Sequence, residues 1–493
     1  MQKYFPRLSG LEWLLILGMS LLYLLVTFYN LTSFPIFVDE AIYGRWSQIA
    51  LHDAAWRFIS LTDGKQPLFM WMTMPMFKLF ADPLLAIRST SVFSGLLTTL
   101  GLFYAGYLLK GKRLGYLAMV LSIFIPFLFF YNRLAVVDAM LTAFGIWLFS
   151  LGLILAKEKR LDLALIVGAV LGLSLLVKSP AKIFLFLLPL GYLTNQDKES
   201  WNKSQVLKYL GLFIVIFVVS SAIYSIQRLS PFMYIIEQKN SDFTLPVREI
   251  LASPTRLWQN TYNTLRWLGF YITWPALLAA ALGIFRFFQK SWRTALYTAS
   301  WLVLPLAAEI AIATLYRSRY IVFVTPIIIL FAAYFLDSLK NKLAYILLAV
   351  LLILPGFFVV SAVFNPVETP LLSDDADYLD GWSSGMGLRE ISDYLISEAK
   401  TGSQPVYVMT EGTFGLLPHG LELYSYGVSG LAIEGIWPLN EIPPASLLAK
   451  KAEGFTVYFL LNNTQVDVTP SGLTEVLSVK KRNDSYIRLY RLN

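Results

Sequence analysis

The chain has 493 residues, of which 56% are hydrophobic and 15% charged, with a formal net charge of +8 and no cysteine. Soluble proteins carry roughly 25% charged residues, so the composition excludes a water-soluble globular protein and a disordered one. The lack of cysteine excludes disulfides, thiolate catalysis and Cys-ligated metal sites. No run of Lys and Arg exceeds three residues, so we interpret the excess positive charge as topological rather than as a nucleic-acid-binding surface.

Long apolar segments recur from the N-terminus to about residue 363. A bilayer core needs about 20 apolar helical residues. This criterion predicts eleven spans, at 11–31, 88–109, 115–131, 136–156, 162–177, 180–194, 206–228, 266–288, 294–315, 319–337 and 343–363. The predicted fold class is therefore a polytopic α-helical membrane protein, with a transmembrane domain over residues 1–364.

Basic residues recur in alternate loops between these spans, at 110–113, 157–160, 286–293 and 340–342. Short cytoplasmic loops retain Lys and Arg, which predicts a cytoplasmic N-terminus. An odd number of spans then places the C-terminus outside. We therefore expect a multi-pass protein of the cell membrane.

Residues 365–493 recover the charge and the turn residues of a soluble domain. Apolar side chains fall on one face of 387–400, which predicts an amphipathic helix. Segments rich in Val, Phe and Tyr predict three short strands, at 405–410, 455–461 and 486–490. We expect a small extracytoplasmic α/β domain.

The first exterior loop, residues 33–87, opens with the adjacent carboxylates Asp39 and Glu40. Two adjacent carboxylates disfavour each other's ionisation, so placing such a pair just above a bilayer is unfavourable and suggests a functional role. The following segment, 41–58, predicts an amphipathic helix in the headgroup plane. The alternative is that the two carboxylates cap this helix, since acidic residues suit a helix N-terminus; both roles can hold together.

The short exterior turns carry basic residues where the topology predicts few. These residues are Arg133, Lys178, Lys182, Arg317 and Arg319. An anionic ligand at the outer surface explains them, because Lys and Arg bind phosphate. The alternative is structural pairing with lipid headgroups or with Asp138 and Glu309. Glu309 lies deep in its predicted span, where a carboxylate suggests either a functional site or an ion pair with a neighbouring helix.

These elements together resemble the GT-C glycosyltransferases, most closely the protein O-mannosyltransferase and aminoarabinose (lipid A) transferase branch. Asp39-Glu40 resembles the acidic signature of the first exterior loop. Lys65-Gln66-Pro67-Leu68 is similar to the branch's Lys-Pro-Pro-Leu element, with Gln66 in place of its first proline. The Arg133 to Asp138 stretch resembles its Arg-x-x-x-x-Asp element, and Arg319-Tyr320 its basic-Tyr element in a late helix. The resemblance covers about 1–363, and no motif of 365–493 matches.

The resemblance implies an inverting transferase that moves a sugar from a polyprenyl-phosphate donor to an acceptor hydroxyl at the outer face of the membrane. It assigns Asp39 as the general base, with in-line attack and no covalent intermediate. Glu40 and Asp138 are expected to orient the acceptor or Asp39. The expected phosphate- and substrate-binding residues are Lys65, Arg133, Lys178, Lys182, Arg317, Arg319 and Tyr320.

Several properties stay open at this stage. Some GT-C enzymes hold a divalent cation at the acidic signature and others do not, and no cluster of His, Asp and Glu decides the metal or cofactor here. The sugar is open, and so is the acceptor, which is a protein, a lipid or a glycan. The alternative functions are a secondary transporter or lipid flippase that handles an anionic lipid, and a non-catalytic assembly subunit. Transporters show paired repeats and midplane polar sites; the exterior charges and the absence of a sequence repeat favour the enzyme.

Overall fold

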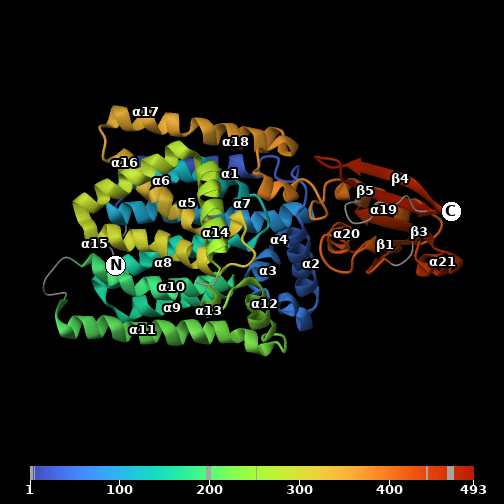
Figure 1. Cartoon of the computed structure of the whole chain (residues 1–493), viewed down its shortest axis with the longest axis horizontal. Helices are drawn as coiled ribbons and strands as arrows, with labels where there is room; N and C mark the ends of the chain where they lie inside the picture. The colour runs from blue at the N-terminus through green and yellow to red at the C-terminus, as the bar shows by residue number, and fades with distance from the viewer. Residues whose placement is uncertain (1–3, 5, 196–200, 251–252, 440–441, 463–470) are drawn as a thin grey trace. The chain divides into compact units, whose positions relative to one another are not determined.

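The computed structural model describes the chain apart from residues 1–3, 5, 196–200, 251–252, 440–441 and 463–470 (Figure 1). The chain forms two compact units. The first comprises Met1–Tyr29, Phe58–Met72 and Arg88–Phe364; the second comprises Asn30–Arg57, Thr73–Ile87 and Asn365–Asn493. Most of the first exterior loop therefore packs with the C-terminal residues.

The first unit is helical. Its helices are α1 (Gly10–Phe28), most of α5 (Pro83–Leu109), α6 (Lys112–Phe124), α7 (Pro126–Asn132), α8 (Val137–Glu158), α9 (Leu161–Leu175), α10 (Lys182–Leu187), α11 (Lys203–Tyr224), α12 (Ile235–Phe243), α13 (Val247–Ile250), α14 (Pro254–Leu268), α15 (Trp274–Ile312), α16 (Thr325–Asp337), α17 (Asn341–Leu351) and α18 (Ile353–Phe364), with the 3₁₀ segments η4 (Ser179–Ala181), η5 (Leu188–Thr194), η7 (Ser225–Leu229) and η9 (Ser318–Val324) and the π-helical η8 (Gly269–Thr273). The short α3 (Leu68–Thr73) and the 3₁₀ segment η3 (Ile59–Asp63) come from the first exterior loop.

The multi-pass helical fold predicted from hydropathy is confirmed. In the described part of the chain, seven helices are long and apolar enough to cross a membrane, or eight if α6 and α7, bent by 61°, form one span. The single apolar helical segment Pro254–Ile312 contains two predicted spans, which are divided at the non-helical Ser291. All eleven predicted spans coincide with helical backbone, while eleven crossings stay a prediction.

Small residues allow the helices of the first unit to pack closely, as is usual in membrane bundles. In α15, a Cβ atom on Gly283 would lie 1.8 Å from the carbonyl oxygen of Phe331 in α16. In α9, Gly168 and Gly172 face side chains of α11 in the same way. The backbones of these helix pairs therefore approach at positions where only glycine fits without rearrangement.

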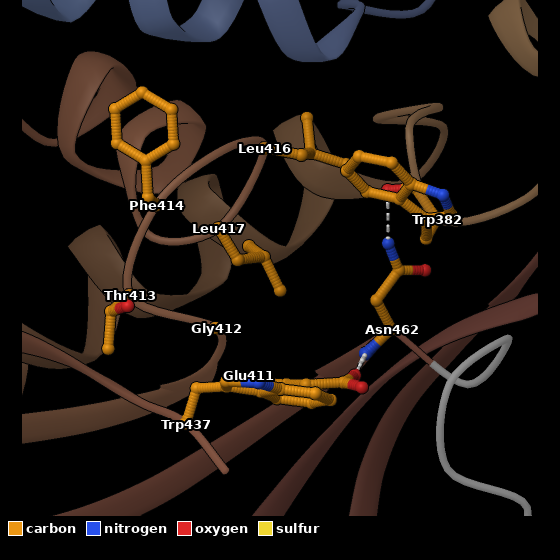
Figure 2. Close-up of a pocket in the computed structure, with 9 residues that line it drawn as sticks. All are labelled: Trp382, Glu411, Gly412, Thr413, Phe414, Leu416, Leu417, Trp437 and Asn462. Atoms are coloured by element: carbon orange, nitrogen blue, oxygen red, sulfur yellow. Dashed lines mark hydrogen bonds between the residues drawn. The ribbon is translucent and has the colours of Figure 1, made fainter. Parts of the chain in front are cut away.

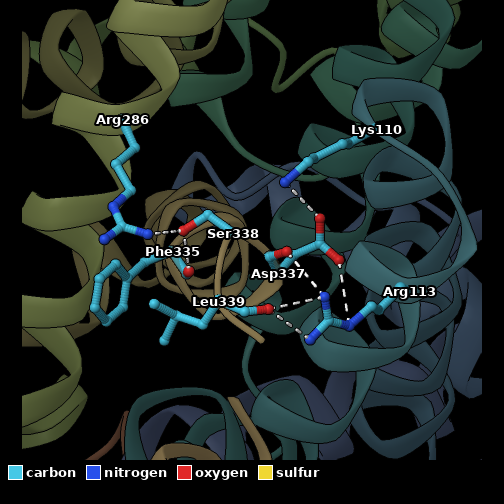
Figure 3. Close-up of polar contacts among 7 residues, drawn as sticks. All are labelled: Lys110, Arg113, Arg286, Phe335, Asp337, Ser338 and Leu339. Atoms are coloured by element: carbon cyan, nitrogen blue, oxygen red, sulfur yellow. Dashed lines mark hydrogen bonds and ion pairs between the residues drawn. The ribbon is translucent and has the colours of Figure 1, made fainter. Parts of the chain in front are cut away.

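Residues at three of the four basic loops assigned to the cytoplasm share one polar cluster in the first unit (Figure 3). Asp337, at the end of α16, accepts Lys110 Nζ at 2.6 Å and lies 3.6 Å from Arg113 Nε. Arg113 also donates to the carbonyl oxygen of Leu339, and Arg286 donates to the Ser338 hydroxyl. Three loops far apart in sequence thus share one polar cluster, while the side of the membrane that it faces stays a prediction.

The second unit contains a five-stranded sheet in the order β2-β1-β3-β5-β4. Its strands are β1 (Val406–Glu411), β2 (Leu431–Ile436), β3 (Thr456–Asn462), β4 (Leu473–Lys480) and β5 (Tyr486–Leu492), and its helices are α2 (Val38–His52), α4 (Met76–Leu79), α19 (Leu388–Thr401), α20 (His419–Tyr424) and α21 (Ala445–Ala452), with the 3₁₀ segments η2 (Ala54–Trp56), η10 (Pro366–Glu368) and η11 (Ser373–Tyr378). Strand β1 pairs in parallel with β2 and β3, while β5 is antiparallel to β3 and β4. The predicted helix and three strands are confirmed as α19, β1, β3 and β5; the two edge strands were missed because both are partly exposed and less apolar.

Helix α2 differs from the predicted helix over 41–58. It begins at Val38 and ends at His52, because the Asp53 side chain accepts the Ala55 N–H and starts the short η2. Its polar side is occupied by protein: Gln48 donates to the carbonyl oxygen of Leu423 at 3.0 Å. The neighbouring Arg45 pairs with Glu422 of α20 at 3.1 Å. The polar face of this helix is therefore a packing surface within the second unit.

Candidate active site

The Lys65–Leu68 element packs against the turn between α9 and α10. The Gln66 side-chain amide donates to the Ser179 hydroxyl at 2.7 Å, and the Leu68 N–H donates to the carbonyl oxygen of Leu176 at 2.9 Å. Gln66 is 5% exposed. A glutamine at this position thus supplies a side-chain donor that proline lacks, and it anchors the element beside Lys178.

Lys178 joins two further predicted elements to this turn. Its Nζ atom lies 2.7 Å from Asp138 Oδ1 and 4.4 Å from the centre of the Tyr320 ring. The Asp138 side chain is 3% exposed and that of Lys178 is 21% exposed. A buried carboxylate requires a cation, and an ammonium over an aromatic face gains a cation–π attraction. Three separate motifs therefore converge on the turn that carries Lys178: two through Lys178 itself and the Lys65–Leu68 element through Ser179 and Leu176.

The Arg317–Tyr320 stretch belongs to the same region. Ser318, which starts η9 and is 1% exposed, shares a 2.7 Å hydrogen bond with the Tyr131 hydroxyl. The Arg319 guanidinium carbon lies 5.5 Å from the centre of the Tyr320 ring. Arg317 and Arg319 are both partly exposed. Anchoring Ser318 between them fixes the backbone that presents these two cations.

A segment that the sequence did not single out also contributes to this region. Lys65 Nζ lies 5.4 Å from the centre of the Phe243 ring, at the end of α12. The same helix holds Lys239, which pairs with Asp63 at 3.0 Å. The backbone beyond it bonds to the end of α15, since Leu245 N–H donates to the carbonyl oxygen of Ile312. No motif in the sequence marks Phe243, because its contact with Lys65 joins two segments that are far apart in the chain.

Two more charged residues lie within the first unit near these groups. Glu309 of α15 interacts electrostatically with both Lys178 and Asp138. Arg88, which begins the predicted second span, is fully buried and interacts electrostatically with Arg133. Arg88 was absent from the predicted site, although a lone Arg within an apolar span is the signal that identifies such residues. Lys182 is exposed at the start of α10.

Arg133 has a structural role in addition to the phosphate contact predicted for it. Its Nη1 atom donates to the carbonyl oxygens of Thr27 at 2.7 Å and Tyr29 at 2.9 Å, at the end of α1. The residue is 5% exposed. The guanidinium thus satisfies carbonyl groups that a helix C-terminus leaves without partners. Phosphate binding by Arg133 stays a prediction.

We expect Arg133→Met to destabilise the protein, lowering the free energy of unfolding by about 2–3 kcal/mol, because hydrogen bonds from a charged donor are lost in a buried position. Thermal unfolding of the detergent-solubilised chain measures this. Arg160→Met, which removes an exposed arginine, is the control. An unchanged midpoint with weakened donor binding would contradict the structural role.

Asp39 and Glu40 occupy the first turn of α2, in the second unit. Glu40 is fully buried, and its Oε2 atom accepts the N–H of Phe37, the N-cap residue, at 3.0 Å. Asp39 is partly exposed. The capping interpretation is thus correct for Glu40, and the cap fixes the turn that carries Asp39. Among the described residues, no group of three or more His, Cys, Asp or Glu could hold a metal ion.

The likeness to known proteins agrees with this arrangement. Residues 64–224 match the family model of dolichyl-phosphate-mannose-protein mannosyltransferases. A comparison with curated protein sequences gives no match.

Three solved structures share the fold. The first is ArnT from Cupriavidus metallidurans in the apo state, with a TM-score of 0.60, 15% identity and 97% of each chain covered. The same protein bound to undecaprenyl phosphate gives a TM-score of 0.60, 14% identity and 98% of each chain. The oligosaccharyltransferase AglB from Archaeoglobus fulgidus, in complex with an inhibitory peptide and a dolichol-phosphate, gives 0.51 and 11%, over 92% of this chain and 70% of that one. The resemblance to the GT-C glycosyltransferases of the mannosyltransferase and ArnT type is thus confirmed.

Proposed function

We propose that this protein is an inverting glycosyltransferase that moves a sugar from a polyprenyl-phosphate donor to an acceptor hydroxyl at the outer face of the membrane. The observation that carries the proposal is the convergence of the Lys65–Leu68, Arg133–Asp138 and Arg319-Tyr320 elements on the Lys178 turn. The shared fold supports it, because ArnT has been solved with undecaprenyl phosphate.

In the proposed reaction the acceptor oxygen attacks the anomeric carbon as the bond from that carbon to the phosphate oxygen breaks. The electron pair of this bond leaves with the lipid phosphate, whose negative charge increases. Lys178 and Arg319 are partly exposed cations that both lie near the Tyr320 ring, and Arg317 is a partly exposed cation two residues before Arg319. Such cations stabilise developing charge. Lys65 and Lys182 are further candidates for stabilising this charge. Lys65 belongs to the element that packs against the Lys178 turn, and Lys182 begins α10 directly after that turn.

The acceptor proton goes to Asp39 in this proposal. A carboxylate near the outer surface can serve as a general base if it is held in position, and the Glu40 cap holds the first turn of α2. Attack and departure on opposite faces of the sugar ring give inversion in one step. The assignment of Asp39 rests on its resemblance to the acidic signature.

The proposed orientation places the Lys110, Arg113 and Arg286 cluster in the cytoplasm (Figure 3). Retention of basic loops inside the cell supports this. The Lys178 turn and the second unit are then extracytoplasmic. The proposed partners are a lipid-linked sugar donor and an acceptor that is a protein, a lipid or a glycan.

Mass spectrometry of surface proteins and lipids, from cells with and without this chain, tests the function. We expect a sugar modification that disappears without the chain and returns with the wild-type chain but not with Asp39→Asn. If the protein is instead a transporter or an assembly subunit, the Asp39→Asn chain should restore the modification. Identical modifications with and without the chain would contradict the proposal.

A further inference from the structure

A cavity of about 240 Å³ opens at one edge of the sheet in the second unit (Figure 2). Glu411 is the last residue of β1, Asn462 is the last of β3, and Trp437 directly follows β2. These three strands are mutually parallel, so all three residues lie at their carboxyl ends. In open α/β sheets this edge is where ligands bind.

Large aromatic side chains surround the cavity without being buried. Trp382 is 49% exposed, Phe414 is 50% exposed and Trp437 is 55% exposed. In the view of Figure 2, Trp437 lies on one side of the cavity and Trp382 and Phe414 on the other. A gathering of exposed aromatic rings around a concave surface indicates a recognition site.

The cavity also presents a rigidly held acceptor. Glu411 is 4% exposed, and its Oε2 atom accepts the Asn462 N–H at 2.7 Å. Within the described part of the chain, its Oε1 atom has no hydrogen-bond partner. Burial raises the pKa of this carboxyl to about 6, against the opposing effects of the Asn462 N–H and of Lys481. A buried acceptor without a donor is unusual in a folded protein.

The polar wall around this carboxylate is fixed in place. The Asn462 side chain donates to the carbonyl oxygen of Trp382 at 2.6 Å and accepts Lys481 Nζ at 2.7 Å. Lys481, 3% exposed, also donates to the carbonyl oxygen of Ser384 at 2.9 Å. The network connects a strand end, a loop and the edge hairpin, so the cavity is shaped before any ligand enters.

We propose that this cavity binds one sugar ring of a glycan carried by the acceptor. A pyranose has apolar C–H faces that stack on aromatic rings and hydroxyl groups that donate to a carboxylate, and the cavity presents both partners together. Its volume lies below the range for drug-sized ligands, which suits a single ring. A cation fits poorly, since Glu411 is the one acidic residue among the described residues that line the cavity. The link to the acceptor rests on the proposed function.

Saturation-transfer NMR of the detergent-solubilised full chain tests the cavity directly. The probes are the methyl glycosides of glucose, galactose, mannose and N-acetylglucosamine. We expect at least one to bind saturably, with a Kd on the order of 1 mM. Trp382→Ala and Trp437→Ala should each weaken that binding about tenfold, because both rings are at the surface and their loss leaves the core intact. Trp56→Ala, which removes an exposed tryptophan of η2, is the matched control.

Failure of all four glycosides to bind, or wild-type affinity in both tryptophan variants, would overturn the proposal. Two measurements distinguish a failure of this cavity proposal from a failure of the proposed enzymatic function. Sugar binding that persists in the chain without any transferase activity supports the cavity and rejects the enzyme. Transfer with wild-type acceptor KM in Trp437→Ala rejects an acceptor role for the cavity and leaves the enzyme in place, whereas a raised acceptor KM with unchanged kcat supports it.

Discussion

Asp39→Asn is expected to abolish sugar transfer, lowering kcat by about 10²–10⁴-fold, the usual contribution of a general base. An amide of the same shape cannot take the acceptor proton. The fold should be retained, because the Glu40 carboxylate, which caps this turn by accepting the Phe37 N–H, stays in place. Initial rates of transfer at saturating donor, measured by mass spectrometry, provide the test.

The matched control for this variant is Asp53→Asn. It removes an equal charge from the same loop, at an exposed residue whose role is to start η2. It should transfer sugar at the wild-type rate. Near wild-type transfer by Asp39→Asn would show that another group accepts the proton. Glu40→Gln separates the two carboxylates, because it should lower the unfolding temperature through the weakened cap.

Lys178→Met has the second largest expected effect, and it acts on both stability and activity. Removing the ammonium leaves the nearly buried Asp138 carboxylate without its cation at 2.7 Å. Breaking such a pair costs about 3 kcal/mol of unfolding free energy. If Lys178 also stabilises the leaving phosphate, kcat should fall by about 10²–10³-fold. Unfolding and transfer assays measure the two effects, with the exposed Lys290→Met as control.

The double variant Lys178→Met with Asp138→Asn separates these two roles. Neutralising both partners removes the uncompensated buried charge, so stability should return toward that of the wild type. Binding of undecaprenyl phosphate, measured on this stable variant, should stay weaker by tenfold or more. Wild-type affinity for this lipid in the double variant would mean that Lys178 serves the fold and not the phosphate.

The convergence of three sequence elements on the Lys178 turn shows how much of the site can be recognised from the sequence. Each of the three elements was recognisable because it is a short run of charged and aromatic residues in an apolar chain. Their meeting point was not recognisable, since Gln66 and Ser179 are separated by 112 intervening residues, and their hydrogen bond exists only once the helices have packed. Phe243 was missed because an isolated aromatic residue carries no pattern, whereas Arg88 had a usable signal, as an arginine at the start of an apolar span.

The sequence by itself determined the membrane-spanning class, the helical segments, the sorting of basic loops and three of the five strands. These properties follow from local hydropathy and from the helical and extended periodicities, which neighbouring residues define. The tertiary structure alone decided that most of the first exterior loop joins the C-terminal residues in one unit. It also decided that Glu411, Trp437 and Asn462 surround one cavity. The physical reason is that strand order and helix packing are set by long-range burial, which no local stretch of sequence encodes.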